Sequence, residues 1–287
     1  MLKAALTIGC ATAIVAAVVL TVRLRHTRRT PSPLSGSEPF GERLAVTVGR
    51  AGGMLIGAYL AGVLTIGAGG RLMMRILAAT SSDDVQGLRT EADEIVGNVS
   101  VGGTVFLIVV AGFFAPVLGL ALFSMLRRWL PDRSLAAGLI GVAIGAGVLV
   151  RPSGFLSAAN RDFTFITPVA LAVTLSLATL VLFGATFGVL VDLLAPRWPR
   201  PGWSPQGVVA VLPFALLLAI PPFFVAAAIG VLVGTVALRM RSPVARDHPV
   251  RPGGEGVSSR LGRILVLALG GLGSLSIVVS AGQVLAL

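Results

Sequence analysis

Long apolar runs alternate with short arginine-bearing segments along the whole chain. The runs cover residues 4–22, 51–70, 102–126, 135–150, 166–194, 207–238 and 264–287. A helix needs about 20 residues to cross the hydrocarbon core of a bilayer, with a range of about 17–25. The pattern therefore predicts an all-α fold, a polytopic transmembrane helix bundle with seven spans.

The sixth run, 207–238, leaves the span count open. It is too long for one upright span and contains the pair Pro221 and Pro222 near its middle. One helix kinked at this pair gives seven spans, whereas a hairpin gives eight. Prolines inside a membrane run free backbone carbonyls, and broken helices of this kind often line transporter substrate sites. Pro221 and Pro222 are therefore a candidate hinge, with an ordinary structural kink as the plainer interpretation.

The distribution of arginines predicts which loops face the cytoplasm, because cytoplasmic loops carry an excess of basic residues. The loops after the first, third and fifth runs are arginine-rich, whereas 71–94 and 151–165 are poorer or contain acids. The loop 239–263 breaks this alternation. It carries six arginines and two acids, yet seven spans would place it outside. A hairpin at 207–238 would return it to the cytoplasm.

Three regions are expected. Residues 1–22 form an N-terminal signal-anchor helix with its N-terminus outside, because the basic cluster follows the run. Residues 23–43 form a cytoplasmic linker rich in basic residues and proline. Residues 44–287 then form a six-helix transmembrane bundle.

The composition excludes a soluble globular domain, a disordered tail and a disulfide scaffold. Hydrophobic residues make up 55% of the chain, charged residues 12%, and the mean hydropathy is +0.93. The net charge of +11 would suggest nucleic acid in a soluble protein. Here the arginines lie between apolar runs, so the expected partners are the lipid bilayer and its anionic headgroups, with no nucleic acid. Usage rich in Arg, Ala, Gly and Val favours a multi-pass protein of a bacterial plasma membrane.

A candidate ligand-binding site lies on the predicted outer side. Arg71 and Arg75 are four residues apart and share one helix face. Asn160, Arg161 and Asp162 lie in a loop on the same side. Together they would hold an anionic headgroup or solute. The plainer interpretations are arginines that extend to the membrane surface or pair with nearby acids, and a loop whose Asn and Asp form a turn and a helix cap.

The sequence gives no support for catalysis. It contains no HExxH, GxxxxGK[ST] or GxSxG motif, and its two histidines lie in loops. Cys10 is the single cysteine, and Lys3 is the single lysine, which excludes a retinal Schiff base in a helical span. Asp192 is expected at the inner interface, so no acid is placed mid-membrane. We therefore expect no catalytic residues, metal or cofactor. The sequence favours a non-enzymatic accessory or scaffold protein, with a small-solute or lipid transporter as the alternative.

Small residues recur at four-residue spacing, which lets helix backbones approach closely in lipid. These stripes comprise Gly49, Gly53, Gly57 and Ala61; Ala137, Gly141 and Gly145; Gly184 and Gly188; and Gly230 and Gly234. A close-packed bundle within one chain is the plainer interpretation. Homo- or hetero-oligomerisation through a stripe is the second.

The segments GAGGRLMMRILA (67–78), LRRWLP (126–131) and NRDF (160–163) together resemble uncharacterised multi-pass membrane proteins of actinobacteria. The resemblance covers about residues 50–199. It implies a membrane location and carries no activity.

Overall fold

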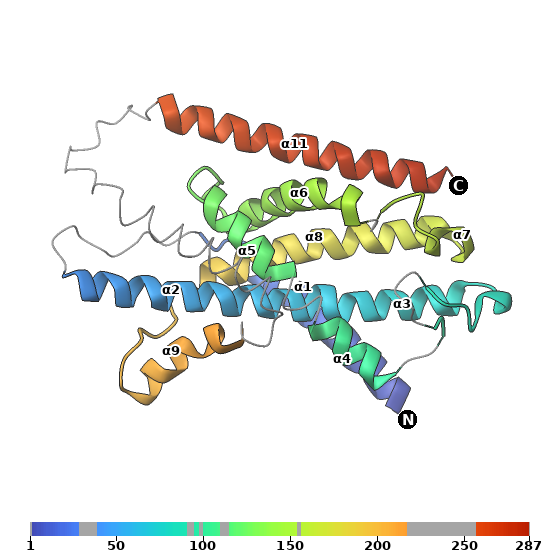
Figure 1. Cartoon of the computed structure of the whole chain (residues 1–287), viewed down its shortest axis with the longest axis horizontal. Helices are drawn as coiled ribbons and strands as arrows, with labels where there is room; N and C mark the ends of the chain where they lie inside the picture. Colours follow the sequence, from blue (N-terminus) through green and yellow to red (C-terminus); the bar gives the residue numbers. More distant parts are fainter. Residues whose placement is uncertain are drawn as a thin grey trace.

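The computed structural model describes residues 2–28, 39–90, 95–97, 100–109, 115–153, 156–216 and 257–286. In these ranges every regular element is a helix, and the longest lie side by side (Figure 1). The candidate hinge at Pro221 and Pro222, the stripe of Gly230 and Gly234, the loop residues 239–256 and residues 29–38 of the linker lie outside the described residues. The elements are α1 (Leu2–Arg23), α2 (Phe40–Ala61), η1 (Gly62–Gly67), α3 (Ala68–Thr80), η2 (Asp83–Val85), α4 (Val101–Val109), α5 (Ala115–Leu126), α6 (Ser134–Ser153), α7 (Asp162–Phe165), α8 (Val169–Leu194), α9 (Pro205–Ala215) and α11 (Val257–Leu285).

Four described helices are long and apolar enough to cross a membrane. They are Ala4–Arg23, Phe40–Thr80, Val169–Leu194 and Arg260–Leu285. The apolar stretches in α5, α6 and α9 are shorter, and the third run is divided between α4 and α5. The all-helical class and its membrane-type helices are as predicted, whereas seven membrane-length helices are not seen among the described residues.

The second helix is longer than its apolar run. α2, η1 and α3 form one continuous helix of 41 residues, which rises about 60 Å at 1.5 Å per residue. This is roughly twice the 30 Å hydrocarbon core, so the helix extends beyond the apolar run at both ends. η1 is a π-helical turn in its middle, where Thr65 Oγ1 donates to Ala61 O at 2.6 Å.

Glycines bring the α6 and α8 backbones into direct contact. A Cβ added to Gly138 would overlap the Gly184 carbonyl oxygen and lie 2.8 Å from Gly188 Cα. The stripe expected on α6 does not make this contact. Gly141 and Gly145 face Phe123 and Leu122 of α5 and not α8. Gly184 and Gly188 of α8 thus pack against α6 of the same chain.

The α2 glycines also pack within the bundle. A Cβ on Gly53 would lie 2.5 Å from Leu194 O, and one on Gly57 would lie 2.8 Å from Leu190 O. One on Gly49 would lie 2.7 Å from Pro199 O. These contacts support the close-packed interpretation of the stripe on this helix.

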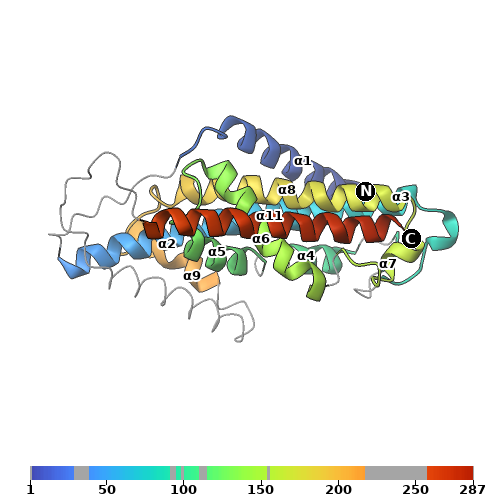
Figure 2. The same cartoon turned by 90° about the horizontal axis from the view of Figure 1, so that it is seen from above.

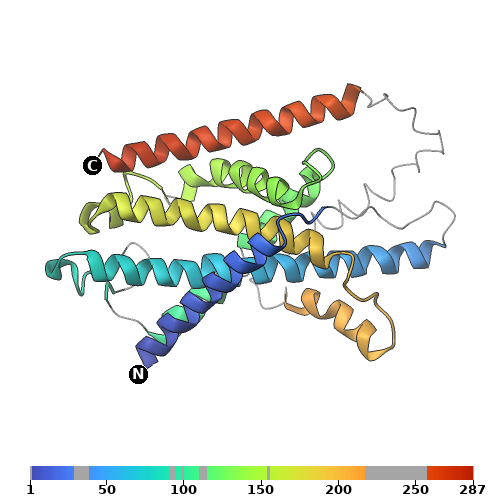
Figure 3. The same ribbon diagram turned by 180° about the vertical axis from the view of Figure 1, so that it is seen from behind.

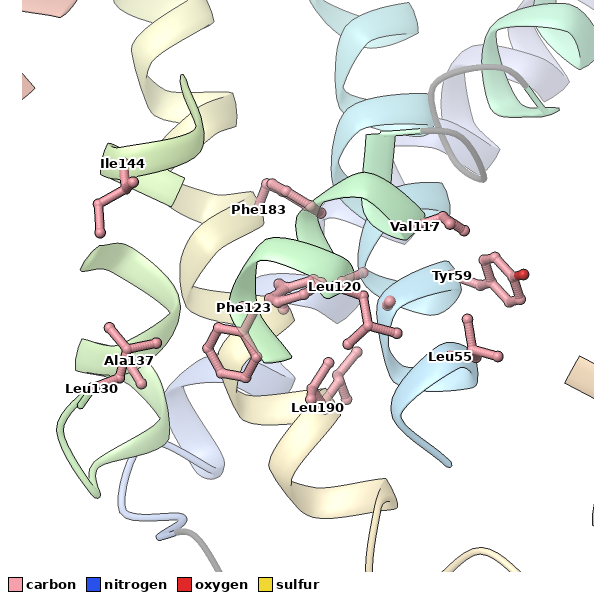
Figure 4. Packing of buried hydrophobic residues seen from close by; sticks show 14 of the residues in the cluster. Leu55, Tyr59, Val117, Leu120, Phe123, Leu130, Ala137, Ile144, Phe183 and Leu190 are labelled. Atoms are coloured by element: carbon pink, nitrogen blue, oxygen red, sulfur yellow. The ribbon is translucent and has the colours of Figure 1, made fainter. Parts of the chain in front are cut away.

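An aromatic core joins α2, α5, α6 and α8 (Figure 4). Phe123 meets Phe187 edge-on with ring centroids 5.3 Å apart, and Phe183 lies 5.4 Å from Phe187. α1 packs on α3 and α8, where Thr21 and Thr186 share a buried 2.8 Å hydrogen bond between hydroxyl groups.

Loop contacts define the two ends of the bundle. At one end, which we call the Arg-rich end, Ser134 N donates to Thr27 O at 3.2 Å beside a bridge between Arg28 and Arg133. At the opposite end, Ser81 Oγ donates to Thr167 O at 3.1 Å. The segments after the first and third runs therefore lie at one end, and those around Ser81 and Thr167 lie at the other. Which end faces the cytoplasm stays a prediction. The basic residues of the Arg-rich end are Arg23, Arg25, Arg28, Arg43, Arg127, Arg128, Arg133, Arg197, Arg200, Arg260 and Arg263.

The chain termini correct the path expected from the sequence. Both lie at the end opposite the Arg-rich end, as all three views show (Figures 1, 2 and 3). α11 starts at the Arg-rich end, where Gly262 lies against the Trp129 indole. α9 starts there too, since Ala210 O accepts from Trp198 Nε1 at 3.3 Å. A path of seven alternating crossings would put the termini at opposite ends, so that path does not fit this arrangement.

Candidate ligand site

A cavity of about 210 Å³ lies at the end opposite the Arg-rich end. α3 and α8 supply its inner walls, and Thr90, residues 95–97 and residues 160–166 supply its outer walls. Its polar lining includes Arg71, Arg75, Thr90, Asn160, Asp162 and Ser176. Four of the five residues predicted as a site therefore meet at one cavity, although Arg71 and Arg75 of α3 are far in the sequence from Asn160 and Asp162 at the start of α7.

Arg71 is the deepest charged group of this cavity. Its residue is 7% exposed, and its Nη2 donates to Ser100 O at 3.3 Å. Its Nε is buried and has no hydrogen-bond partner among the described residues. Arg71 lies nine residues before the end of α3, or about 13 Å along the axis. The Arg71 side chain is enclosed by protein, and among the described residues it forms no ion pair with Asp83 or Asp84. The acids at 91–94, the other expected partners, lie outside the described residues.

Asn160 and Asp162 combine a structural role with a place on the cavity wall. Asn160 Oδ1 accepts from Asp162 N at 2.8 Å, which fixes the turn that leads into α7. The predicted turn is therefore confirmed, and both residues still line the cavity. Arg161 is exposed and does not line it, so the structure does not bring this fifth candidate to the site.

A tight loop after α3 closes the outer side of the cavity. Gly87 N donates to Val96 O at 3.1 Å, and Val96 N donates to Leu88 O at 2.9 Å. Gly87 and Gly97 have φ of 88° and 80°, which side chains with a Cβ rarely adopt. Gln86 Nε2 then ties this loop to Ala78 O at 2.5 Å. This wall was not among the predicted site residues. Gly87 and Gly97, which flank the acidic segment, are the sequence feature that could have indicated a tight loop here.

The cavity is suited to an anion that carries an apolar part. Arg71 and Arg75 offer guanidinium donors, which match carboxylate and phosphate oxygens well. Met73, Leu77 and Ile166 provide apolar wall on the same cavity. The described residues contain no group of three His, Cys, Asp or Glu side chains that could hold a metal.

A second polar cluster lies at the Arg-rich end. Arg127 Nη2 donates to Asp192 Oδ2 at 2.6 Å, and the two side chains are only 4% and 9% exposed. Ser134 Oγ donates to the same oxygen at 2.8 Å, and Arg127 Nη1 donates to Pro131 O at 2.9 Å. The cluster ties the ends of α5 and α8 to the start of α6. Asp192 is thus buried and paired close to the end of α8. Its expected position at the inner interface stays a prediction.

Comparison with known proteins adds no relative, since no family model, curated protein or solved structure matches this chain. The resemblance to actinobacterial membrane proteins therefore stays a prediction, carried by its three short segments.

Proposed function

We propose that this protein is a multi-pass membrane protein that binds an anionic ligand in the Arg71 cavity and catalyses no reaction. The buried guanidinium of Arg71, whose Nε has no hydrogen-bond partner among the described residues, is the single observation that carries the proposal. A charged side chain within a membrane span is costly, and such residues usually mark ligand or ion pathways. An anion bound beside Arg71 would neutralise the charge and satisfy its remaining donors.

We also infer the orientation of the bundle. The Arg-rich end faces the cytoplasm by the distribution of basic residues, which places the cavity and both termini outside. We infer six passes, formed by α1, by α2 with α3, by α4 with α5, and by α6, α8 and α11. The segment from α9 to α11 starts and ends on the cytoplasmic side, and its apolar length favours a hairpin, giving eight spans in a bacterial plasma membrane.

This orientation predicts the result of reporter fusions. A fusion at Gly254 should be active as a cytoplasmic reporter, because the arginine-rich loop that holds it stays inside. A fusion after Leu287 should be active only as an external reporter. A reporter after Arg133 serves as the cytoplasmic control. An external Gly254 or a cytoplasmic C-terminus would contradict the even span count.

Replacing Arg71 should weaken anion binding. We expect Arg71→Gln to weaken binding by about tenfold or more, because a charge-assisted hydrogen bond contributes about 1.5–3 kcal/mol. Thermal shift of the purified protein in neutral detergent would measure this, with phosphate, glycerol 3-phosphate, acetate and phosphatidylglycerol as probes. Arg161→Gln, an exposed arginine outside the cavity, is the matched control. A response that both variants retain would contradict the proposal.

Transport of the ligand is a second candidate function. The cavity lies toward the outer end, while the Phe123 core and the Arg127–Asp192 pair pack the bundle toward the cytoplasmic end. This asymmetry is typical of one state of an alternating-access cycle. The scaffold hypothesis has less support, since the glycines of α2 and α8 already pack against this chain's own helices.

A further inference from the structure

The two cavity arginines also border a second, narrower space. Leu6, Thr7 and Cys10 of α1 and Leu72 of α3 form a cleft of about 10 Å³ that Arg71 and Arg75 line as well. The side chains of Arg71 and Arg75 therefore lie between the cavity and the side of the bundle where α1 packs on α3.

α1 forms a loosely packed flank. Only 17% of its apolar window is buried, against 61% for the α2–α3 helix and 56% for α8. On its outward side, Ile8 and Val15 are 66% and 61% exposed. In a membrane this side faces lipid, so the cleft adjoins the hydrocarbon region rather than water. Parting α1 from α3 would disrupt less packing than moving either of the other two helices.

These features distinguish between the sources of an anion. Arg71 directly follows the apolar run 51–70 and borders the cleft beside the apolar residues of α1, so it lies near the level where an apolar span meets lipid headgroups. A phosphate that carries an acyl chain can bring that chain along an apolar route, whereas a free phosphate has nothing to place there. The apolar cavity wall of Met73, Leu77 and Ile166 offers such a route beside the guanidinium groups.

We propose that the ligand is an anionic membrane phospholipid that enters between α1 and α3. Its phosphate binds Arg71 and Arg75, and an acyl chain lies along the apolar cavity wall. This inference rests on the proposed anion-binding function and specifies the class of its ligand.

The single cysteine provides the test, because Cys10 lines the cleft beside Arg71. The full-length protein is placed in phosphatidylcholine bilayers, with or without phosphatidylglycerol, and the rate of Cys10 alkylation by neutral N-ethylmaleimide is measured. We expect phosphatidylglycerol to slow labelling about fivefold or more through occupancy of the cleft. Soluble glycerol 3-phosphate at the same concentration should give no protection.

Matched variants separate binding from general bilayer effects. Arg71→Gln should lose the protection, and Arg161→Gln should keep it. Ile8→Cys combined with Cys10→Ser places the thiol on the lipid-facing side of α1, where phosphatidylglycerol should leave the labelling rate unchanged. Equal slowing at both cysteine positions would overturn the proposal.

The remaining outcomes distinguish the phospholipid proposal from the anion-binding proposal on which it rests. Arg71-dependent protection by glycerol 3-phosphate equal to that by phosphatidylglycerol would overturn the lipid assignment and leave anion binding standing. Absence of Arg71-dependent protection by either compound, together with no Arg71-dependent thermal shift, would overturn both.

Discussion

Replacing Asp192 with alanine should lower the free energy of unfolding by about 3–5 kcal/mol, because it leaves the Arg127 guanidinium buried without its counter-ion. Arg127 and Asp192 are joined at 2.6 Å with almost no exposure. The change also removes the acceptor of Ser134 Oγ, at the junction of three helices. Equilibrium unfolding in mixed detergent micelles would measure the loss.

Two variants test whether the unpaired charge causes this effect. Arg127→Met combined with Asp192→Leu removes both charges, and should recover a large part of the loss. The pair of Glu42 and Arg200 is the exposed comparison, since its atoms are 3.6 Å apart and its side chains are 49% and 59% exposed. Arg200→Gln should cost less than about 1 kcal/mol. Equal losses for Asp192→Ala and the double variant would show that packing, not charge, dominates.

Adding one methyl group to Gly138 should destabilise the bundle by about 3 kcal/mol or more. Its Cβ would meet backbone atoms of Gly184 and Gly188, and a backbone, unlike a flexible side chain, cannot rotate away. Overpacking against movable groups already costs about 1–3 kcal/mol. Gly138→Ala should therefore force α6 and α8 apart and reduce both the folded yield and the free energy of unfolding.

Gly271→Ala is the control for this prediction. Gly271 lies in α11, and a Cβ there would meet nothing within 4 Å. Alanine is favoured over glycine in a helix by about 1 kcal/mol, so this change should be neutral or stabilising. Gly188→Ala should match Gly138→Ala, because both residues lie at the same crossing. A Gly138→Ala protein as stable as Gly271→Ala would contradict the close backbone contact.

Part of the candidate site could be predicted from the chain alone. The four-residue spacing of Arg71 and Arg75 follows from helix geometry, and the arginine pattern places the loop of Asn160 and Asp162 on the same side. Arg161 is adjacent to both in sequence, but its side chain is exposed and does not line the cavity. The burial of Arg71 depends on α1, which no local pattern associates with α3.

The ion pair shows the same limit. Asp192 and Arg127 each lie near the end of an apolar run, where a charge ordinarily faces water or headgroups. Their burial follows from the α6–α8 crossing at Gly138, which brings Ser134 within reach of Asp192. Four-residue spacing does not predict this crossing, because on α6 it selects Ala137, Gly141 and Gly145, whereas the crossing is made by Gly138.

The sequence by itself determined the helical class, the membrane-type apolar helices and which loops share an end, since hydrophobic periodicity, run length and arginine placement are local properties of the chain. Only the tertiary structure decided that the termini share one end, that Arg71 is enclosed and that Arg127 binds Asp192. Each of these depends on which helix faces lie against each other. In a chain this rich in glycine and aliphatic residues, many helix faces have nearly the same composition, so packing selects among alternatives that the sequence pattern leaves equal.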